Sequence, residues 1–274
     1  MMLNISIVLY HPDWTQVSNL CEELLRASCT RKIYLVDNSE EKVQKVPISS
    51  GKVAYIWNEG KNVGYGKAHN IAIRQSVRWN TPLHLVINAD VWIQASDLDL
   101  LHDFMTSHPE VGSLMPKVTY PNGELQYLCK LLPTPWDVFA RRFLPMKWTQ
   151  KRNERYELRQ TGYDRPMNVP YLSGCFMLLR TEAALKARLF DERYFMYPED
   201  IDLTRTIHRD YLTLYYPAVT IIHDHAKASY HNWKMTWVHS VNMCRYFNKW
   251  GWLWDKERRL FNRLTLSQFD MSNK

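Results

Sequence analysis

Acidic and histidine side chains stand at three points of the sequence where they could bind a divalent cation or accept a proton. Asn88 and Asp90 directly follow a short apolar run. Glu199 and Asp200 come just before an apolar-periodic segment, and His223 closes another apolar run. Carboxylate oxygens and a neutral imidazole nitrogen are common metal ligands, and a half-buried carboxylate is a candidate general base. Together the three clusters indicate chemistry that uses a metal ion and a proton acceptor.

Each cluster also has a structural explanation that requires no function. Asn and Asp are common after strands because they make turns. Acids are favoured at a helix N-terminus by the helix dipole, although three acids within the segment 199–202 exceed what capping needs. Strand alternation would place His223 and His225 on one side with Asp224 opposite. A histidine at that position can simply form a hydrogen bond.

The segment 62–70 reads NVGYGKAHN, and its glycines precede a predicted helix. Such glycines let backbone N–H groups approach an anion. The segment lacks the third glycine of the dinucleotide fingerprint GxGxxG and the GKS/T ending of a P-loop. A dehydrogenase and a P-loop ATPase are therefore disfavoured.

The elements that must position these residues alternate along the first hundred residues. Short apolar runs predict strands, and apolar residues at three- and four-residue steps predict helices. This alternation is typical of a mostly parallel sheet with helices on both faces, whose ligands bind beyond the carboxyl ends of the strands. Polar clusters fall at three of those ends, at 37–39, 58–66 and 88–90. Strands are predicted at 3–10, 33–36, 53–57 and 83–87, and helices at 14–25, 67–79 and 97–107.

The second half of the chain is less regular. Prolines and charges are frequent from residue 121 to residue 170, so we predict an irregular excursion there. A strand at 171–179, a helix at 199–209 and strands at 212–216 and 219–222 follow. We divide the chain into a domain of residues 1–230 and a C-terminal helical extension of residues 231–274.

Composition and charge exclude several classes of protein. The 274 residues carry a net charge of +7, with 46% hydrophobic and 23% charged residues, which is ordinary globular composition and not that of a disordered tail. No apolar run approaches the roughly 18 to 20 residues of a membrane-spanning helix, and the first ten residues lack the features of a signal peptide. The five scattered cysteines favour a reduced, cytoplasmic setting over a disulfide framework or a zinc site.

The C-terminal extension combines tryptophans with basic residues. This combination suits the headgroup layer of a membrane, so peripheral contact with the inner face of the plasma membrane is one prediction. It could also suit nucleic acid through stacking and phosphate contacts, although no recognition motif for nucleic acid appears. The third explanation is a helical layer that covers the domain with a solvated basic face. The tryptophans are Trp233, Trp237, Trp250, Trp252 and Trp254, and the basic residues are Lys234, Arg245, Lys249, Lys256, Arg258, Arg259 and Arg263.

Taken in order, the motifs resemble those of glycosyltransferase family 2, especially its bacterial rhamnosyltransferase-like branch. They are VDNS, NVGYGKAHN, VINADV, LSGCFMLLR, FDERYFMYPEDIDL and VTIIHDH. The resemblance spans roughly residues 3 to 250, and its most specific part is the run 174–223. It implies a GT-A fold, with a mostly parallel central sheet, helices on both faces and additional C-terminal helices. It also implies an inverting mechanism, a nucleotide-sugar donor, and Mg²⁺ or Mn²⁺.

The resemblance assigns roles to individual residues. Asn88 and Asp90 stand where the family has its DxD element, and because the first acid is Asn here, Asp90 is the expected metal ligand. His223 matches a histidine that ligates the metal in some relatives. Glu199 and Asp200 match the acidic pair at the catalytic position, with Asp200 as the expected base.

On the donor side, Asp37 matches the acid that contacts the nucleotide base, while Asn62 and Gly64 match the donor-side loop. Two departures concern the nucleoside pocket. The first strand ends Leu9-Tyr10-His11 where many relatives have Thr-Tyr-Asn. The loop after VDNS continues Glu40-Glu41-Lys42, without the acid that usually follows in the family. The sequence therefore leaves the base and the sugar of the donor open.

The function predicted from these motifs is transfer of a sugar from a nucleoside-diphosphate donor, such as dTDP-rhamnose or a UDP-sugar. The expected acceptor is a saccharide or polyprenyl-linked saccharide of bacterial surface polysaccharide synthesis. A non-catalytic nucleotide- or saccharide-binding module of the same fold is the alternative, and Asp90, Glu199, Asp200 and His223 together argue against it. A nucleotidyltransferase ranks low because residues 3–14 contain no Lys or Arg to hold a triphosphate.

Overall fold

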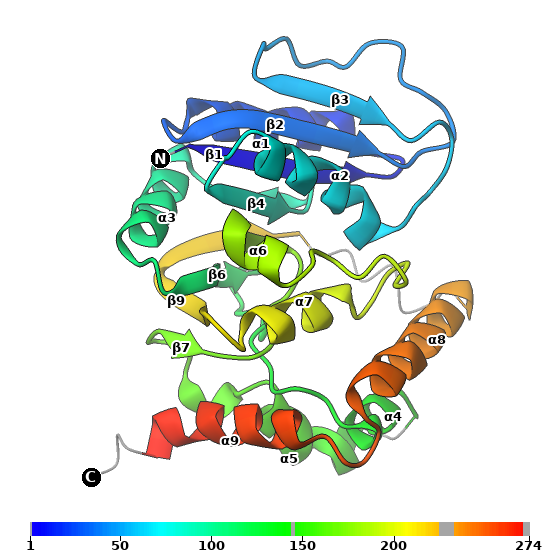
Figure 1. Ribbon diagram of the computed structural model, residues 1–274, viewed down its shortest axis with the longest axis vertical. Coiled ribbons are helices and arrows are strands. Elements are labelled where there is room, and N and C mark those ends of the chain that lie inside the picture. Colours follow the sequence, from blue (N-terminus) through cyan, green and yellow to red (C-terminus); the bar gives the residue numbers. More distant parts are fainter. Residues whose placement is uncertain (1, 144–145, 225–232, 271–274) are drawn as a thin grey trace.

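The computed structural model describes residues 2–143, 146–224 and 233–270 and shows one extended sheet with helices on both of its faces (Figure 1). The N-terminal half supplies the alternating strands and helices that the sequence predicts. Its elements are β1 (Leu3–Leu9), α1 (Trp14–Arg26), β2 (Thr30–Asp37), β3 (Val53–Trp57), α2 (Tyr65–Arg78), β4 (Leu83–Ile87), β5 (Val91–Trp92) and α3 (Ala95–Ser107).

The C-terminal half completes the sheet and adds a layer of helices. Its elements are β6 (Val111–Thr119), α4 (Pro135–Phe143), α5 (Met146–Tyr156), the short 3₁₀ helix η1 (Arg159–Thr161), β7 (Met167–Asn168), β8 (Phe176–Arg180), α6 (Thr181–Lys186), α7 (Glu199–Ile207), β9 (Leu212–His223), α8 (Trp233–Trp250) and α9 (Lys256–Asp270).

The strands follow the order β3-β2-β1-β4-β8-β6-β9-β5, with β7 paired to β9. Strands β1 to β4 are mutually parallel, and β6 is parallel to β9. Strand β8 lies between β4 and β6 and is antiparallel to both. The sheet is therefore mostly parallel, as predicted, and the carboxyl ends of β1, β2, β4, β6 and β9 lie along one edge.

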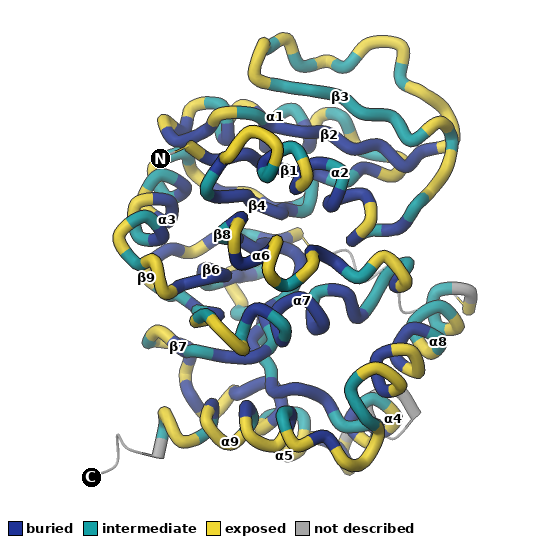
Figure 2. Tube along the Cα trace, viewed as in Figure 1, coloured by how far each residue is buried: buried dark blue, intermediate teal, exposed yellow. Residues whose placement is uncertain are grey.

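Both faces of the sheet are buried, and strand alternation assigns residues to each face. Ile33 and Leu35 of β2 face the cluster that contains the inner sides of α1 and α3. Tyr34 and Val36 face α2 on the other side. The same alternation in β4 sends Val86 to a cluster with α6 and α7. Figure 2 shows the resulting buried centre beneath exposed helix surfaces.

Several predicted boundaries were wrong. The segment 121–170, predicted to be irregular, contains the helices α4 and α5. Its prolines and charged residues obscure the apolar pattern that would have predicted them. The strands predicted at 212–216 and 219–222 are one strand, β9, with a register shift opposite Pro116 and Lys117. Strands β6 and β7 and the short helix α6 were not predicted, and the strand expected at 171–179 begins only at Phe176.

The C-terminal helices pack directly against the helix that begins with the acidic pair. Met243, Tyr246 and Phe247 of α8 are buried in a cluster with Ile201 of α7 and Phe261 of α9. Within the described ranges, no helix combines the length and apolar character required to cross a bilayer.

Candidate active site

Asp90 and His223 come together because β5 pairs with the end of β9. Val91 lies opposite His223 in this antiparallel pair, and the Asp224 N–H donates to the Asp90 carbonyl at 2.9 Å. The His223 Nε2 atom lies 3.3 Å from the Asp90 Oδ1 atom. Two residues separated by 133 positions thus present a nitrogen and an oxygen to the same point at the carboxyl edge of the sheet.

The donor atoms of this pair fit a small divalent cation. Two neighbouring ligands of an octahedral ion at about 2.1 Å from the metal are about 3 Å apart, close to the observed 3.3 Å. Burial opposes charging of His223, but interactions with Asp90 and Cys175 together outweigh it and raise the His223 pKa to about 10. No cluster of three or more His, Cys, Asp or Glu ligands occurs in the described part of the chain. Among the described residues, Asp90 and His223 therefore supply only part of the ligand set that such a cation needs.

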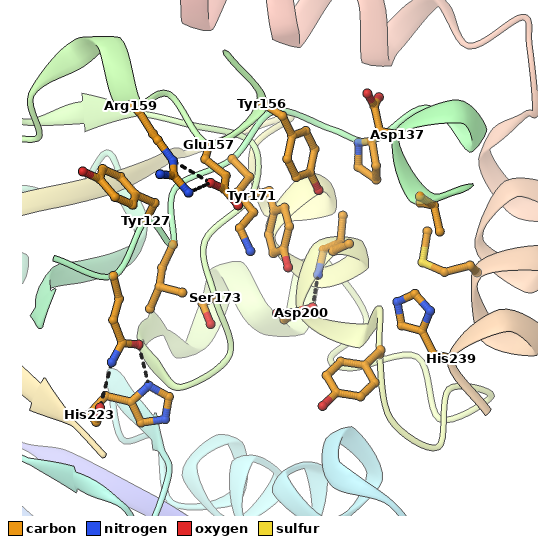
Figure 3. Close-up of a pocket in the computed structure, with 18 of the residues that line it drawn as sticks. Tyr127, Asp137, Tyr156, Glu157, Arg159, Tyr171, Ser173, Asp200, His223 and His239 are labelled. Carbon is orange, nitrogen blue, oxygen red and sulfur yellow. Dashed lines mark hydrogen bonds and ion pairs between the residues drawn. The ribbon is translucent and has the colours of Figure 1, made fainter. Parts of the chain in front are cut away.

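Asp200 and His223 both line a cleft of about 600 Å³. Figure 3 shows both side chains on the wall of this cleft, with Ser173 between them. The Asp200 carboxylate accepts hydrogen bonds from the backbone N–H groups of Gly174, at 3.1 Å, and Ile201, at 2.8 Å. Burial raises the Asp200 pKa even so, while nearby Lys130 lowers it. The carboxylate is thus fixed in position and more basic than a solvated one.

Glu199 differs from its neighbour because it does not line the cleft. Its side chain is buried, and its Oε2 atom has no hydrogen-bond partner among the described residues. Burial, reinforced by the charge of Asp200, raises the Glu199 pKa to about 8. At neutral pH Glu199 is therefore mainly protonated. Of the two acids, only Asp200 lines the cleft, where an acceptor hydroxyl could reach it.

The raised pKa of Glu199 predicts a pH-dependent stability. A carboxyl group whose pKa is higher in the folded than in the unfolded chain stabilises the fold at low pH, and this contribution is lost as pH rises from about 4.5 to about 8. We expect the free energy of unfolding of the wild type to fall by up to about 1.4 kcal/mol per pH unit across this window relative to Glu199→Gln. Urea titrations of both proteins at pH 5 and pH 8.5 measure the difference. Parallel pH profiles would contradict the assignment.

Asn88 and Tyr65 connect the loop after β4 to the loop before β8. The Tyr65 hydroxyl lies 3.0 Å from Asn88 Oδ1 and 2.7 Å from the Gly174 carbonyl oxygen. The Asn88 N–H donates to the Cys175 carbonyl at 3.0 Å. Tyr65 thereby helps to fix Gly174, the residue whose N–H donates to Asp200. We did not single out Tyr65 from the sequence, because an aromatic residue at the start of a helix carries no distinctive signal.

Asp37 is placed at the end of β2 beside a second hollow of about 460 Å³. Its carboxylate accepts from the Tyr55 hydroxyl at 2.7 Å and the Ser39 N–H at 2.8 Å. His11 and Glu40, the residues at the two departures from the family pattern, line the same hollow. Asp37 therefore lies apart from the cleft that Asp200 lines.

Asn62 and Gly64 shape the loop that precedes α2. Asn62 Oδ1 accepts from the Gly64 N–H at 3.1 Å. Gly64 has a φ of +89°, and a Cβ atom there would lie 2.3 Å from the Phe195 carbonyl oxygen. Only glycine fits this position, which lets the α2 N-terminus pack against the chain that leads into α7.

The last residues of NVGYGKAHN have structural roles. His69 is buried with its Nδ1 atom 2.7 Å from the Ser6 hydroxyl, and Asn70 exchanges hydrogen bonds with the Phe190 backbone. His225, which alternation would have placed beside His223, lies outside the described residues.

The fold is that of GT-A glycosyltransferases, as solved structures with similar folds show. GalNAc-T7, solved with UDP, GalNAc and Mn²⁺, aligns with a TM-score of 0.60 and 16% identity over 81% of this chain and 43% of its own. TarS 1–349 of S. aureus, in complex with UDP-GlcNAc, aligns with a TM-score of 0.59 and 14% identity over 90% of this chain and 67% of its own.

The amino-acid sequence is similar to an N-acetylglucosaminyl-diphospho-decaprenol L-rhamnosyltransferase of Mycobacterium tuberculosis. The two are 31% identical over a 185-residue alignment that covers 62% of this chain and 58% of the relative. The chain thus matches less than two thirds of the relative's length. No protein-family model matches the chain. These findings confirm the resemblance to the rhamnosyltransferase-like branch of family 2 that the motifs indicated.

Proposed function

We propose that the protein is an inverting, metal-dependent glycosyltransferase. The observation that carries this proposal is the convergence of Asp90, His223 and Asp200 on one edge of the sheet, with His223 and Asp200 in the same cleft. The relative of known activity is a transferase, so the alternative of a non-catalytic module of the same fold is not favoured.

In the proposed reaction, Asp200 accepts the proton of an acceptor hydroxyl while that oxygen forms a bond to the anomeric carbon of the donor sugar. The bond from this carbon to the diphosphate breaks on the opposite face, and the nucleoside diphosphate leaves with the electron pair. One displacement inverts the anomeric configuration. Asp90 and His223 would hold Mg²⁺ or Mn²⁺, which when bound neutralises negative charge on the leaving group.

The donor we propose is dTDP-rhamnose or a UDP-sugar. The relative's name specifies rhamnosyl transfer, and TarS was solved with UDP-GlcNAc. The nucleoside would occupy the hollow beside Asp37, and the donor-side loop of Asn62 and Gly64 would lie next to it. Asn88, at the turn before Asp90, would face the diphosphate.

The acceptor we propose is a saccharide or polyprenyl-linked saccharide, used in the synthesis of a bacterial surface polysaccharide. The relative acts on such a decaprenol-linked compound, according to its name. The cleft walls suit an amphiphilic acceptor: Tyr127, Glu157 and Arg159 supply polar and aromatic surface, whereas Val138 and Met243 supply apolar surface. Figure 3 shows the Arg159 guanidinium between Glu157 and the Tyr127 ring.

A donor screen followed by a transfer assay tests the proposed function. We expect one nucleotide sugar to raise the melting temperature of the protein only when Mn²⁺ is present, because a ligand bound to the folded form stabilises it. That donor should then support transfer to a polyprenyl-diphosphate-linked N-acetylglucosamine, with inversion seen by NMR of the product. Asp90→Asn should lose the Mn²⁺-dependent part of the stabilisation. Equal stabilisation with and without Mn²⁺ would contradict metal dependence.

We also propose peripheral contact with an anionic membrane through the C-terminal layer. Trp233 and Trp237 are 85% and 73% exposed on one face of α8, because residues four apart lie on the same side of a helix. Met235, Thr236 and His239 of the same helical stretch line the cleft. An aromatic surface on another face of this helix would bring a lipid-linked acceptor near the cleft and hold the protein at the inner face of the plasma membrane.

Removal of these two tryptophans should weaken membrane association. We expect the double variant Trp233→Ser/Trp237→Ser to sediment with phosphatidylglycerol-containing liposomes at most one tenth as well as wild type, since exposed indole rings anchor in the headgroup layer. Trp79→Ser is the matched control, because Trp79 is an exposed tryptophan at the end of α2. Liposome binding that is unaffected in the double variant, or absent in wild type, would contradict the membrane proposal.

A further inference from the structure

Gln126 contacts the His223 ring at Nδ1, whereas Asp90 lies near the other ring nitrogen, Nε2. The Gln126 side chain is buried, and the residue follows the tight turn at 120–123 that leads away from β6. The Gln126 N–H donates to the Val118 carbonyl at 2.9 Å, which fixes the backbone. The Gln126 Oε1 atom lies 3.0 Å from His223 Nδ1.

The orientation of the Gln126 amide is determined by its other contacts. The Nε2 atom lies 2.7 Å from the His223 carbonyl oxygen and 3.3 Å from the Thr119 carbonyl oxygen. Carbonyl oxygens only accept hydrogen bonds, so the amino group of Gln126 must face them. The amide oxygen must then face the imidazole.

This orientation decides which ring nitrogen of His223 carries the proton. The Gln126 Oε1 atom can only accept, so His223 Nδ1 must donate to it. In the neutral form that binds a metal, the ring then has its lone pair on Nε2, which lies 3.3 Å from Asp90 Oδ1. An imidazole lone pair and a carboxylate oxygen that face each other are a pair of ligands for one cation. Second-shell partners of this kind fix the tautomer and orientation of metal-binding histidines.

We propose that Gln126 is a positioning residue, which holds His223 in the tautomer and ring orientation needed to bind the metal ion together with Asp90. The inference rests on the proposed metal role of Asp90 and His223. Gln126 would thus be a third residue that supports metal binding. Its hydrogen bonds to the carbonyls of Thr119 and His223 also connect the turn after β6 to the end of β9.

Two substitutions separate the positioning role from a purely structural one. Gln126→Glu keeps an oxygen that accepts from Nδ1 but loses both donations to the carbonyls. Gln126→Met loses the acceptor as well as the donors. If Gln126 positions His223, Gln126→Met should weaken Mn²⁺ binding by about 10- to 100-fold, and Gln126→Glu should bind Mn²⁺ at least tenfold more tightly than Gln126→Met.

The measurement is the electron paramagnetic resonance signal of free Mn²⁺ titrated into the metal-free protein, with no nucleotide present. Gln268→Met is the matched control, because Gln268 makes a similar amide clamp on the Asn168 backbone far from the cleft, and it should bind Mn²⁺ as wild type does. Equal Mn²⁺ affinities of the Glu and Met variants would overturn the proposal, as would the absence of Mn²⁺ binding by wild type.

A second readout does not depend on the stability of the variants. In wild-type protein saturated with Mg²⁺, ¹⁵N NMR of the His223 ring should show a proton on Nδ1 and none on Nε2. A proton on Nε2 would overturn the proposal even if Gln126→Met failed to fold. Metal binding that follows these expectations without any sugar transfer would count against the proposed function alone.

Discussion

Replacement of Asp200 by Asn is expected to reduce sugar transfer by about 10²- to 10⁴-fold, the usual contribution of a general base. The amide cannot accept the proton of the acceptor hydroxyl. Donor binding should persist, because Asp37 and Asp90 are untouched. The measurements are initial rates of transfer at saturating donor and, separately, the donor dissociation constant.

The structure indicates the control that this experiment needs. Asp200 accepts from two backbone N–H groups, and the amino group of an Asn would face one of them, so some loss of stability is expected. Unfolding of the variant should therefore be measured at the assay temperature. Asp210→Asn is the matched control: Asp210 lies just beyond α7 and pairs with Lys186 on the surface. Wild-type transfer by folded Asp200→Asn would exclude Asp200 as the base.

Replacement of Arg205 by Met is expected to lower the free energy of unfolding by about 3–5 kcal/mol, the usual cost of removing one partner of a buried ion pair. The Arg205 guanidinium donates to both carboxylate oxygens of Asp255, at 2.8 and 2.7 Å, and both side chains are almost fully buried. Asp255 also accepts from the Arg258 N–H at 2.8 Å and so caps α9. One carboxylate thus joins α7, which starts with the acidic pair, to the start of α9.

A surface arginine on the same side of the molecule provides the comparison. Arg209 pairs with Glu257 but is about half exposed, so Arg209→Met should cost no more than about 1 kcal/mol. Adding Asp255→Asn to Arg205→Met should recover part of the lost stability, because it removes a buried carboxylate that has lost its bidentate partner and keeps only the longer ion pair with Arg258. Urea unfolding measures all four proteins. A loss below about 1 kcal/mol for Arg205→Met would show that α7 does not depend on this pair.

Much of the sheet could be predicted because its information is local. The apolar runs of β3 and β4 match their strands at both ends. Strand β4 is buried along its whole length, and a strand buried on both faces is a nearly continuous apolar segment. The helices α4 and α5 could not be predicted in this way. Their apolar residues pack against parts of the chain that lie far away in sequence, and prolines at 133, 135 and 145 interrupt the local pattern.

The residues of the site also differ in how far the sequence could predict them. Residue type indicated Asp90, Asp200 and His223 as candidates, because carboxylates and imidazoles at the ends of apolar runs are chemically distinctive, and the family resemblance gave them roles. The residue types and positions of Gln126 and Tyr65 did not predict a role at the site. Their roles depend on hydrogen bonds to backbone atoms 97 and 109 positions away, and the sequence contains no local pattern for such bonds.

The sequence by itself therefore determined the class of fold and the chemical types at the site, because hydrophobic periodicity and residue chemistry are properties of short segments. Only the tertiary structure decided which acid of the pair 199–200 faces the cleft and which nitrogen of His223 faces Asp90. Both depend on the direction in which a side chain points, and that direction is set by the packing of β9, α7 and the turn after β6 against one another.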